Sequence, residues 1–388
     1  MTLKSDYFDN VPSRKGSGSY KWDCRPGVLP LWVADMDFPT APCIIEALSK
    51  RAAHGIFGYT FVGDDYYDAL CRWFAERHAY TIDREMVIYT IGVVPALSAI
   101  IKALAKEGEG VVVQTPVYNC FFSSIRNNGC RVVENPLLRH DLPDGTFTYT
   151  MDLEALDRIC ADPSVTLMLL CNPANPAARL WTRQELEEVC RITARHGVRV
   201  VSDEIHCELT PPATSYTPYG TIDKSAIICV SPSKAFNTAG LQLANIVCPD
   251  AATRALIDRA INLNEVCDVN PFGVEALKAA YTPEGAEWLD ALRSYIYANY
   301  QFAHEQLRKH LPQCPVGLLE ASYLVWLDIT PLGLTGDEAE ELLIEHAGVW
   351  INSGHMYGDN RYIRINLACP RARLADGLDR ICKTLASR

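Results

Sequence analysis

The sequence predicts an α/β fold in which a mostly parallel sheet lies between helices, followed by a smaller α+β unit. The chain has 388 residues, which is too long for one simple core and suits two domains. Its middle alternates short apolar runs with longer amphipathic stretches, a pattern typical of parallel α/β layers. Near Pro283 this alternation gives way to one long helical pattern and two further strands.

Five short apolar runs in the middle of the chain predict buried strands. They cover residues 86–90, 110–114, 165–171, 198–202 and 225–230. After the first run, apolar residues recur at helical spacing from Val93 to Leu104. Before the fourth run, residues 182–197 predict a helix that Thr182 caps, with Glu185 three residues later and Gly197 at its end.

The C-terminal part of the chain predicts the smaller unit. A long helix covers much of residues 287–310, and strands are expected at 323–329 and 361–367. The first 40 or so residues show no clear element and are expected to wrap both units. We therefore expect an N-terminal wrapping segment that packs with the small domain, a large domain and a small C-terminal domain, spanning residues 1–45, 46–283 and 284–388.

Composition and charge exclude several function classes. The net charge is −11 without any basic cluster, which argues against nucleic acid or an anionic membrane as the main partner. No apolar run approaches the roughly 18 residues that span a bilayer, and MTLKSDYFDN lacks a signal-peptide centre, so we expect a cytoplasmic protein. The 15 cysteines show no CxxC spacing and are interpreted as small buried residues, with no disulfide and no metal site expected.

Polar side chains follow each predicted strand of the sheet. Gly92 follows the first run, Tyr118 the second, Asn172 the third, Asp203 the fourth, and Ser231, Ser233 and Lys234 the fifth. Because ligands of open α/β sheets bind outside the carboxyl ends of the strands, these residues are expected to face one crevice.

Together these residues suit one flat, phosphorylated aldehyde. Gly92 at a helix start and the two serine hydroxyls form a phosphate cradle. Asp203 offers a buried carboxylate that needs a cationic partner, Tyr118 offers a face for stacking, and Lys234 offers an amine that can form a Schiff base. Pyridoxal 5′-phosphate (PLP) meets all of these demands and is the predicted cofactor.

Each residue taken alone also fits a structural role. Asp203 could cap a helix, and Asn172 in NPANP could form a turn. Tyr118 could pack in the core, and Ser233 and Lys234 could be ordinary loop residues. The cofactor interpretation rests on their shared order at successive strand ends.

The same motifs resemble a known family. The series GVVPAL, TPVY, CNPANP, SDEIH, SPSKAFNTAGLQ and RIN resembles fold-type I PLP enzymes of the aminotransferase class I/II superfamily. More narrowly, LPLWVADMDFP, GYT, DEIH, AGLQ and YLVWLD resemble bacterial C–S lyases of the cystathionine β-lyase type. The resemblance spans nearly the whole chain, from KWD at residue 21 to RINLACPR at 364–371. It implies a carbon–sulfur β-lyase that releases a thiol or sulfide, pyruvate and ammonia.

The resemblance also implies a role for each site residue. Lys234 would bind PLP covalently and act as the catalytic base, Asp203 would pair with the ring nitrogen, and Asn172 would bond the ring O3′. Tyr118 would stack on the ring, and His206 of DEIH joins the cofactor-binding set. The phosphate would be held by Gly92, Val93, Ser231 and Ser233, and by Tyr59 from the other subunit of a homodimer. The substrate would be bound by Arg364, Asn172 and Tyr118, with Arg364 on its carboxylate.

The pattern of YIRINL gives Arg364 independent support. Strand alternation places Arg364 on one face with Tyr362 and Asn366, opposite the apolar residues. A guanidinium on this face could bind a carboxylate with two parallel hydrogen bonds. The alternative is a surface salt bridge.

Four residues depart from the family pattern. Ala174, Ala178, Ala235 and Ile91 stand where the family has His, Gly, a hydroxyl residue and Pro. We expect them to alter the surroundings of the cofactor and leaving group, and so the choice of substrate. Two alternatives share the same site residues: an aminotransferase, and a PLP-binding regulatory protein with incidental activity.

Overall fold

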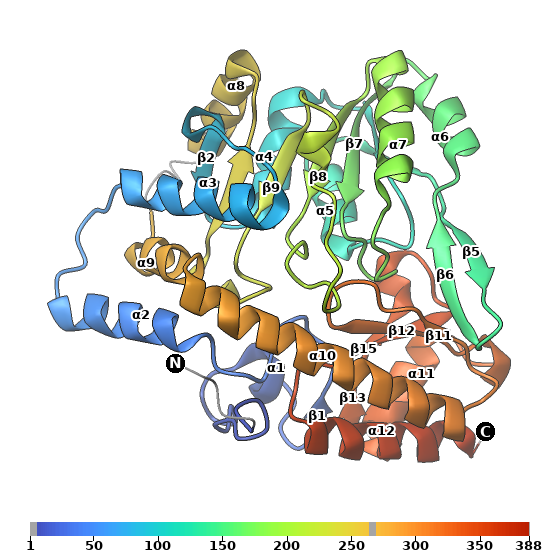
Figure 1. Cartoon of the computed structure of the whole chain (residues 1–388). Coiled ribbons are helices and arrows are strands. Elements are labelled where there is room, and N and C mark those ends of the chain that lie inside the picture. Colours follow the sequence, from blue (N-terminus) through green and yellow to red (C-terminus); the bar gives the residue numbers. More distant parts are fainter. Residues whose placement is uncertain (1–5, 264–268, 388) are drawn as a thin grey trace.

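The larger part of the computed structural model, which describes residues 6–263 and 269–387, is built on a seven-stranded sheet (Figure 1). The sheet order is β2-β10-β9-β8-β7-β3-β4, and within it β10 runs antiparallel to both neighbours. The strands are β2 (Val87–Thr90), β3 (Gly110–Val113), β4 (Arg131–Glu134), β7 (Val165–Cys171), β8 (Arg199–Asp203), β9 (Ile227–Val230) and β10 (Ala244–Val247). The five predicted strands are therefore confirmed.

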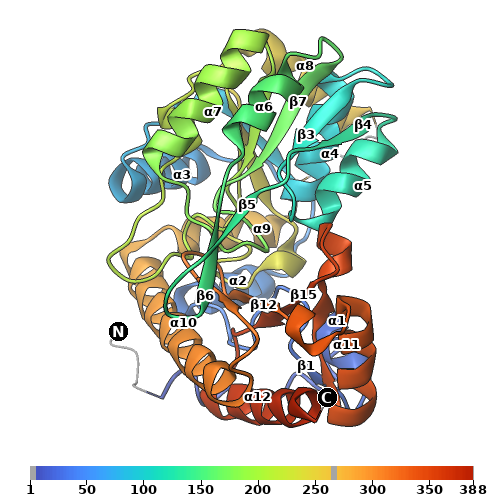
Figure 2. The ribbon, with the colours of Figure 1, turned by 90° about the vertical axis from the view of Figure 1, so that its right-hand side faces the viewer.

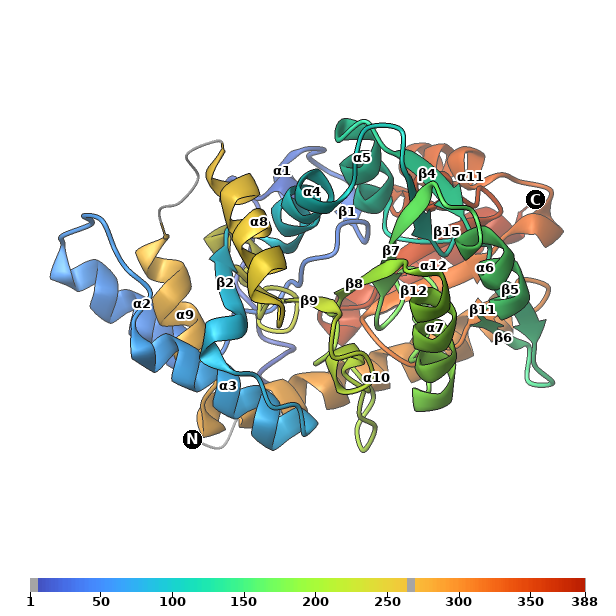
Figure 3. The same cartoon turned by 90° about the horizontal axis from the view of Figure 1, so that it is seen from above.

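Helices cover both faces of this sheet, as Figure 3 shows from above. One face is covered by α4 (Val93–Leu104), α5 (Asn119–Asn127) and α8 (Ala251–Asn262), the other by α3 (Asp64–His78), α6 (Leu153–Cys160) and α7 (Arg183–His196). Along β7, Leu167 and Leu169 join the core under the first set, while Met168 and Leu170 join the core under the second. Burial on both faces explains why this strand is a continuous apolar run.

The ends of α7 follow the sequence signals. Thr182 accepts from the backbone N–H of Glu185, and the Glu185 side chain accepts from the Thr182 N–H, which completes a capping box. At the other end Gly197 has a φ of +71°, a conformation that a residue without Cβ adopts at little cost. The prediction for residues 182–197 is confirmed at both ends.

A second, six-stranded sheet lies below the first and has the order β14-β15-β12-β11-β6-β5. Its strands are β5 (Leu138–Asp141), β6 (Thr146–Thr150), β11 (Val316–Gly317), β12 (Leu324–Asp328), β14 (Asn352–Ser353) and β15 (Tyr362–Asn366). Helices α10 (Pro283–His310) and α12 (Arg371–Ala386) share its core, and α11 (Gly336–Leu342) packs beside β14 and β15. Figure 2 shows the hairpin β5–β6 reaching down to this sheet from the middle of the chain.

The N-terminal segment touches both units. After α1 (Tyr20–Asp23), strand β1 (Leu29–Pro30) pairs in parallel with β13 (Val349–Trp350). Further on, α2 (Pro42–His54) packs on α9 (Pro271–Ala280). Residues 1–5 of this segment lie outside the described residues, and the three-part division of the chain stays a prediction.

In the described part of the chain, no helix is both long and apolar enough to cross a membrane. The cysteines described there are free thiols, and most of them are buried.

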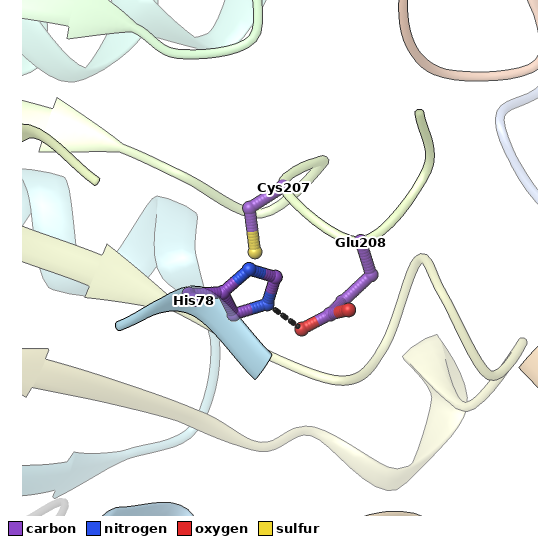
Figure 4. Close-up of side chains that lie close together, drawn as sticks. All are labelled: His78, Cys207 and Glu208. Atoms are coloured by element: carbon purple, nitrogen blue, oxygen red, sulfur yellow. Dashed lines mark hydrogen bonds and ion pairs between the residues drawn. The ribbon is translucent and has the colours of Figure 1, made fainter. Parts of the chain in front are cut away.

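A buried ionic cluster joins α3 to the loop after β8 (Figure 4). Glu208 accepts from Trp73 Nε1 at 2.6 Å and from Arg77 Nε at 2.9 Å, and lies 2.6 Å from His78 Nε2. Potential metal-ligand atoms of His78, Cys207 and Glu208 lie within 4.8 Å of one another. Both oxygens of the Glu208 carboxylate already form hydrogen bonds, and Arg77 balances its charge. We therefore interpret the cluster as a structural link between α3 and the loop after β8.

We expect Glu208→Gln to destabilise the protein near neutral pH by about 3 kcal/mol, because it removes the buried anion that pairs with Arg77 Nε and leaves Arg77 only the exposed Asp290 as a partner. Burial alone would raise the Glu208 pKa, but His78 and Arg77 outweigh it and hold the pKa at about 2. The stabilisation is therefore fully present above the ordinary value of 4.5 and is lost as pH falls from there toward 2. Thermal unfolding of wild type, Glu208→Gln and the exposed-pair control Glu187→Gln tests this from pH 7 to pH 3. An equal effect of both variants at pH 7 would contradict the assignment.

Candidate active site

One cavity of about 420 Å³ opens where the parallel strands end and the second sheet begins. Its wall includes Gly92, Tyr118, Asp203 and Lys234 from the large sheet's strand ends, and Arg364 from β15. The expectation that polar residues after successive strands face one crevice is met by these residues. The cavity lies at the carboxyl edge of β3, β8 and β9, where open α/β sheets bind ligands.

Lys234 stands four residues beyond the end of β9 and points into this cavity. Its Nζ donates to the carbonyl of Ala34 at 2.7 Å, and no acidic side chain forms an ion pair with it in the described chain. Burial and the nearby Arg364 cation lower the pKa of Lys234 to about 8, against the opposing effect of Asp35 and Asp203. A lysine with a lowered pKa is a better nucleophile and base at neutral pH.

Asp203 is the last residue of β8 and is almost fully buried. Its carboxylate accepts from the backbone N–H of Ile205 at 3.1 Å, which is its one hydrogen bond among the described residues. Burial raises the pKa of Asp203 to about 7, although this N–H and the charge of Lys234 favour the ionised form. A cation placed against Asp203 would remove this cost, so the carboxylate suits a protonated ring nitrogen.

Asn172 follows β7 and is fully buried, but it stands behind the cavity wall. Its Nδ2 donates to Glu204 Oε1 at 3.1 Å and to the Thr217 carbonyl at 3.0 Å. Its Oδ1 has no hydrogen-bond partner among the described residues. Glu204 and Thr217 thus fix the amide behind the wall, and its oxygen stays without a partner.

His206 lines the cavity with a buried side chain whose Nδ1 also lacks a partner in the described chain. Burial and the cations Lys234 and Arg364 lower the pKa of His206 to about 3, so the imidazole is neutral. Tyr118 is half-buried at the start of α5 and lines the same cavity. Burial raises the Tyr118 pKa, so its hydroxyl keeps its proton.

The predicted phosphate cradle is partly assembled. Gly92, Val93 and Ser233 line the cavity, with Gly92 directly before α4 and Val93 as its first residue. A Cβ on Gly92 would lie 3.3 Å from Pro95 Cδ, so a side chain would crowd this helix start. Ser231 stands behind the wall, where its hydroxyl donates to the Leu243 carbonyl at 2.6 Å and accepts from Ser233 N–H at 3.1 Å. Its hydroxyl therefore orients the loop that carries Ser233.

Arg364 lies in the middle of β15 with 3% of its surface exposed, so the surface salt bridge considered above is wrong. Its guanidinium donates to Asn175 Oδ1 at 3.3 Å and to the Trp32 carbonyl at 3.1 Å, and it lies 4.5 Å from the Tyr357 ring centroid. No carboxylate pairs with it in the described chain, and its Nε has no partner there. A buried guanidinium of this kind suits a substrate carboxylate.

Tyr59 does not reach the cavity of its own chain. It lies on the segment between α2 and α3 (Figure 1) and is 96% exposed. Ile56, Phe57 and Phe61 on the same segment are also exposed. We define residues 56–61 as the apolar arm.

The structure adds site residues that the sequence patterns did not single out. The N-terminal segment contributes Tyr20, Trp32, Val33 and Ala34 to the cavity wall, and the C-terminal unit contributes Asn352, Met356 and Tyr357. Asn175, the second Asn of NPANP, also lines the cavity. The motif LPLWVADMDFP contains three of these residues and was the one available signal for them.

Three of the four departures from the family pattern are buried away from the cavity. Ala174, Ala178 and Ala235 lie behind its wall, whereas Ile91 lines it. Ala178 has a φ of +52°, where a Cβ is disfavoured and glycine is more comfortable. Ala178 therefore affects the backbone near Arg179. Of the four departures from the family pattern, Ile91 is the one that can contact a ligand.

The unpaired groups of this cavity fit PLP. A buried carboxylate with a raised pKa, an amine with a lowered pKa and an open helix start meet three separate features of that molecule. Each of these groups is costly to leave unpaired, and the cofactor would satisfy them together.

Comparison with known proteins identifies the class. Residues 26–381 match the family profile of aminotransferase class I and II, and the chain belongs to this family. It is 39% identical to cystathionine beta-lyase PatB of Bacillus subtilis, over 98% of this chain and 100% of the relative. It is 34% identical to protein MalY of Escherichia coli, over 96% of each chain.

Solved structures agree with this placement. Cystalysin of Treponema denticola, which contains a pyridoxal 5′-phosphate cofactor, superposes with a TM-score of 0.93 at 31% identity and 98% coverage of each chain. The PLP-bound C–S lyase of Staphylococcus hominis superposes with a TM-score of 0.90 at 29% identity, over 97% of each chain. The fold-type I fold predicted from the sequence, and the resemblance to cystathionine β-lyase-type C–S lyases, are both confirmed.

We expect Lys234→Met to stabilise the cofactor-free protein at pH 7 by about 1–3 kcal/mol, because the wild-type amine must hold a proton in an unfavourable place. The unfolded chain keeps that proton up to about 10.5, so the wild-type penalty is full below pH 8 and fades as pH rises from 8 to 10.5. Urea unfolding of cofactor-free wild type, Lys234→Met and the exposed control Lys383→Met at pH 7 and 9.5 measures the difference. A Lys234→Met gain that does not shrink at pH 9.5 would refute the lowered pKa.

Proposed function

We propose that the protein is a PLP-dependent carbon–sulfur β-lyase that acts on a sulfur-containing amino acid in the cytoplasm. One observation carries the proposal: Lys234, Asp203 and Arg364 meet in a single cavity, and none of them forms an ion pair within the described chain. An amine, a carboxylate and a guanidinium left unpaired in one buried place are the groups that a PLP enzyme needs for its cofactor and its substrate. The relatives named as C–S lyases support the reaction.

The cofactor would be held by residues from five strand ends. Asp203 would hold the proton on the ring nitrogen, Asn172 would lie beside the ring O3′, and Tyr118 would lie against the ring face. The remaining contacts would come from Gly92, Val93, Ser233 and His206, with Ser231 positioning the serine loop and Lys234 forming the covalent link. When bound, PLP supplies an electron sink for negative charge that develops at the substrate Cα.

The reaction then follows from what the side chains do. Arg364 binds the α-carboxylate with its fork and orients the substrate. Lys234 removes the proton from Cα, and its lowered pKa makes it an effective base at neutral pH. A thiolate leaves Cβ, one water is taken up, and one thiol, one pyruvate and one ammonia are released.

An aminotransferase would use the same residues for the first proton transfer. The names of the curated relatives favour the lyase, because the one named cystathionine beta-lyase PatB is 39% identical and the one named putative aminotransferase YugH is 24% identical, although a solved structure named putative aminotransferase is 36% identical. A regulatory PLP-binding protein would hold the cofactor without turnover.

We expect the PLP-loaded protein to form pyruvate from cystathionine or cysteine without any added 2-oxo acid. Pyruvate is followed with a coupled dehydrogenase assay and the thiol with a chromogenic disulfide, with Lys234→Ala as the inactive control. Product formation that depends on a 2-oxo acid acceptor, without pyruvate, would make the protein an aminotransferase. Absence of both products with PLP bound would favour the regulatory protein.

We also propose a homodimer with shared active sites. The apolar arm exposes four large apolar side chains in six residues, which is more than a free surface segment normally carries. Tyr59 on this arm cannot serve the cavity of its own chain, but a partner's arm could supply a hydroxyl to the phosphate at Gly92. The resemblance of GYT to the family's crossing loop supports the same arrangement.

We expect Tyr59→Phe to weaken PLP retention, and a mixture of Tyr59→Phe with Lys234→Ala to recover activity by subunit exchange. Each mixed dimer holds one site in which Lys234 and the partner's Tyr59 are both present. A mixture of Lys234→Ala with Asp203→Asn is the matched control, because both residues belong to one chain's cavity and no mixed site is whole. Recovery in neither mixture, or full activity of a monomer in sedimentation, would overturn the shared site.

A further inference from the structure

Asn366 is a buried residue of β15 that the chemistry described above does not use. Only 1% of its surface is exposed, and it does not line the cavity. Its Nδ2 donates to the carbonyls of Val33 at 2.6 Å and Asp35 at 2.7 Å, and its Oδ1 accepts from the Ala368 N–H at 2.7 Å. Both N–H groups of the amide and its oxygen are therefore bonded to backbone, which is the arrangement of a side chain that holds a segment in place.

The two carbonyls that Asn366 bonds lie on either side of Ala34. The Asp35 N–H donates to the Val33 carbonyl at 2.9 Å, which closes a tight turn with Ala34 at its centre. The carbonyl of Ala34 accepts from Lys234 Nζ at 2.7 Å. Asn366 thus fixes the turn whose central carbonyl holds the amine of Lys234.

The same turn also connects to Arg364, which stands two residues before Asn366 on β15. Arg364 donates to the carbonyl of Trp32 at 3.1 Å, and Trp32 directly precedes Val33. We propose that Asn366 is a positioning residue, which sets the separation between Lys234 and Arg364 by fixing the backbone that both cations contact. The inference rests on the proposed function, because that function assigns the two cations their tasks.

The separation matters because the two cations act on neighbouring atoms of one substrate. Arg364 would bind the α-carboxylate, and Lys234 would remove the proton from Cα, to which this carboxylate is attached. A shift of about 1 Å between a base and its proton costs about 100-fold in rate. A neutral amide suits the task, since it does not titrate and adds no net charge beside Lys234.

A second buried asparagine provides a matched control. Asn299 on α10 donates through Nδ2 to the carbonyls of Leu367 and Cys369, both at 2.9 Å, and its Oδ1 accepts from Arg371 Nε at 2.7 Å. It bridges two carbonyls two residues apart, as Asn366 does, and it is also fully buried. In the described chain its amide makes no hydrogen bond to the turn that Asn366 holds.

The first measurement follows exchange of the Cα proton of L-alanine with D2O by NMR in the PLP-loaded protein. L-alanine has no leaving group on Cβ, so exchange reports proton removal by Lys234 whether or not the protein is a lyase. We expect Asn366→Ala to lower the exchange rate constant at saturating alanine by about 30-fold to 100-fold, and Asn299→Ala by less than about threefold. Asn366→Asp keeps the size and the acceptor for Ala368 but loses both donors, so it should fall with Asn366→Ala, whereas Asn299→Asp should not.

The second measurement needs no cofactor. Trace acetylation of the cofactor-free protein with acetic anhydride at pH 7, quantified by mass spectrometry, compares Lys234 with the exposed Lys383. A carbonyl bonded to an ammonium group favours the charged, unreactive form. We therefore expect Asn366→Ala to raise the labelling of Lys234 relative to Lys383 by about threefold or more, and Asn299→Ala to leave this ratio unchanged.

Several results would overturn the role of Asn366. They are wild-type exchange in both Asn366 variants, an equal loss of exchange in Asn299→Ala, and an unchanged labelling ratio in Asn366→Ala. If wild type exchanges the Cα proton but forms no pyruvate from cystathionine, the lyase proposal fails and the comparison of Asn366 with Asn299 still decides the inference. If wild type exchanges no proton, the labelling ratio decides it.

Discussion

The segment Trp32–Met36 holds the two units of the protein around one cavity through its backbone carbonyls. Ala34 O accepts from Lys234 Nζ at 2.7 Å and from Tyr323 Oη at 3.0 Å, so one carbonyl ties the catalytic lysine to the C-terminal unit. Trp32 O accepts from Arg364 and Asn352, which both belong to the C-terminal unit. Because this segment forms no helix or sheet, its carbonyls are free, which is why side chains from both units can bond to it. The geometry of the site therefore depends on a part of the chain with almost no regular structure.

This arrangement buries charged side chains that do not contribute to the stability of the fold. Asp203, Lys234 and Arg364 share one cavity, and none of them forms an ion pair within the described chain. Each of these buried charges lowers the stability of the protein without ligand. Elsewhere the fold treats buried charge differently, since Glu208 is bonded through both oxygens and balanced by Arg77. A structural charge such as Glu208 therefore has its partner within the chain, whereas a functional charge such as Lys234 is paired only when a ligand binds.

Much of the fold could be predicted because local patterns dictate it. Strands buried on both faces need continuous apolar runs, and α7 carries its start and stop signals in Thr182 and Gly197. The pairing of β6 with β11 could not be predicted, because it joins residues near 147 to residues near 316 and leaves no local signal. In the site, strand ends predicted Asp203 and Lys234, whereas Trp32 and Tyr20 come from a segment without periodicity. Ser231 shows a further limit, since only the fold reveals that its hydroxyl serves the Leu243 carbonyl.

Different residues of the cavity determine the reaction and the choice of substrate. Proton removal from Cα depends on Lys234 and Asp203, and an aminotransferase would need both residues as much as a lyase does. What distinguishes one family member from another must therefore come from residues that touch the rest of the substrate. Apart from Asp203, Lys234 and Arg364, the described residues that line the cavity are uncharged at neutral pH, and the N-terminal segment supplies Tyr20 and Trp32 among them. The segment that fixes Lys234 through Ala34 thus also lines the cavity, so a sequence change there can alter substrate choice while the strand ends keep the chemistry.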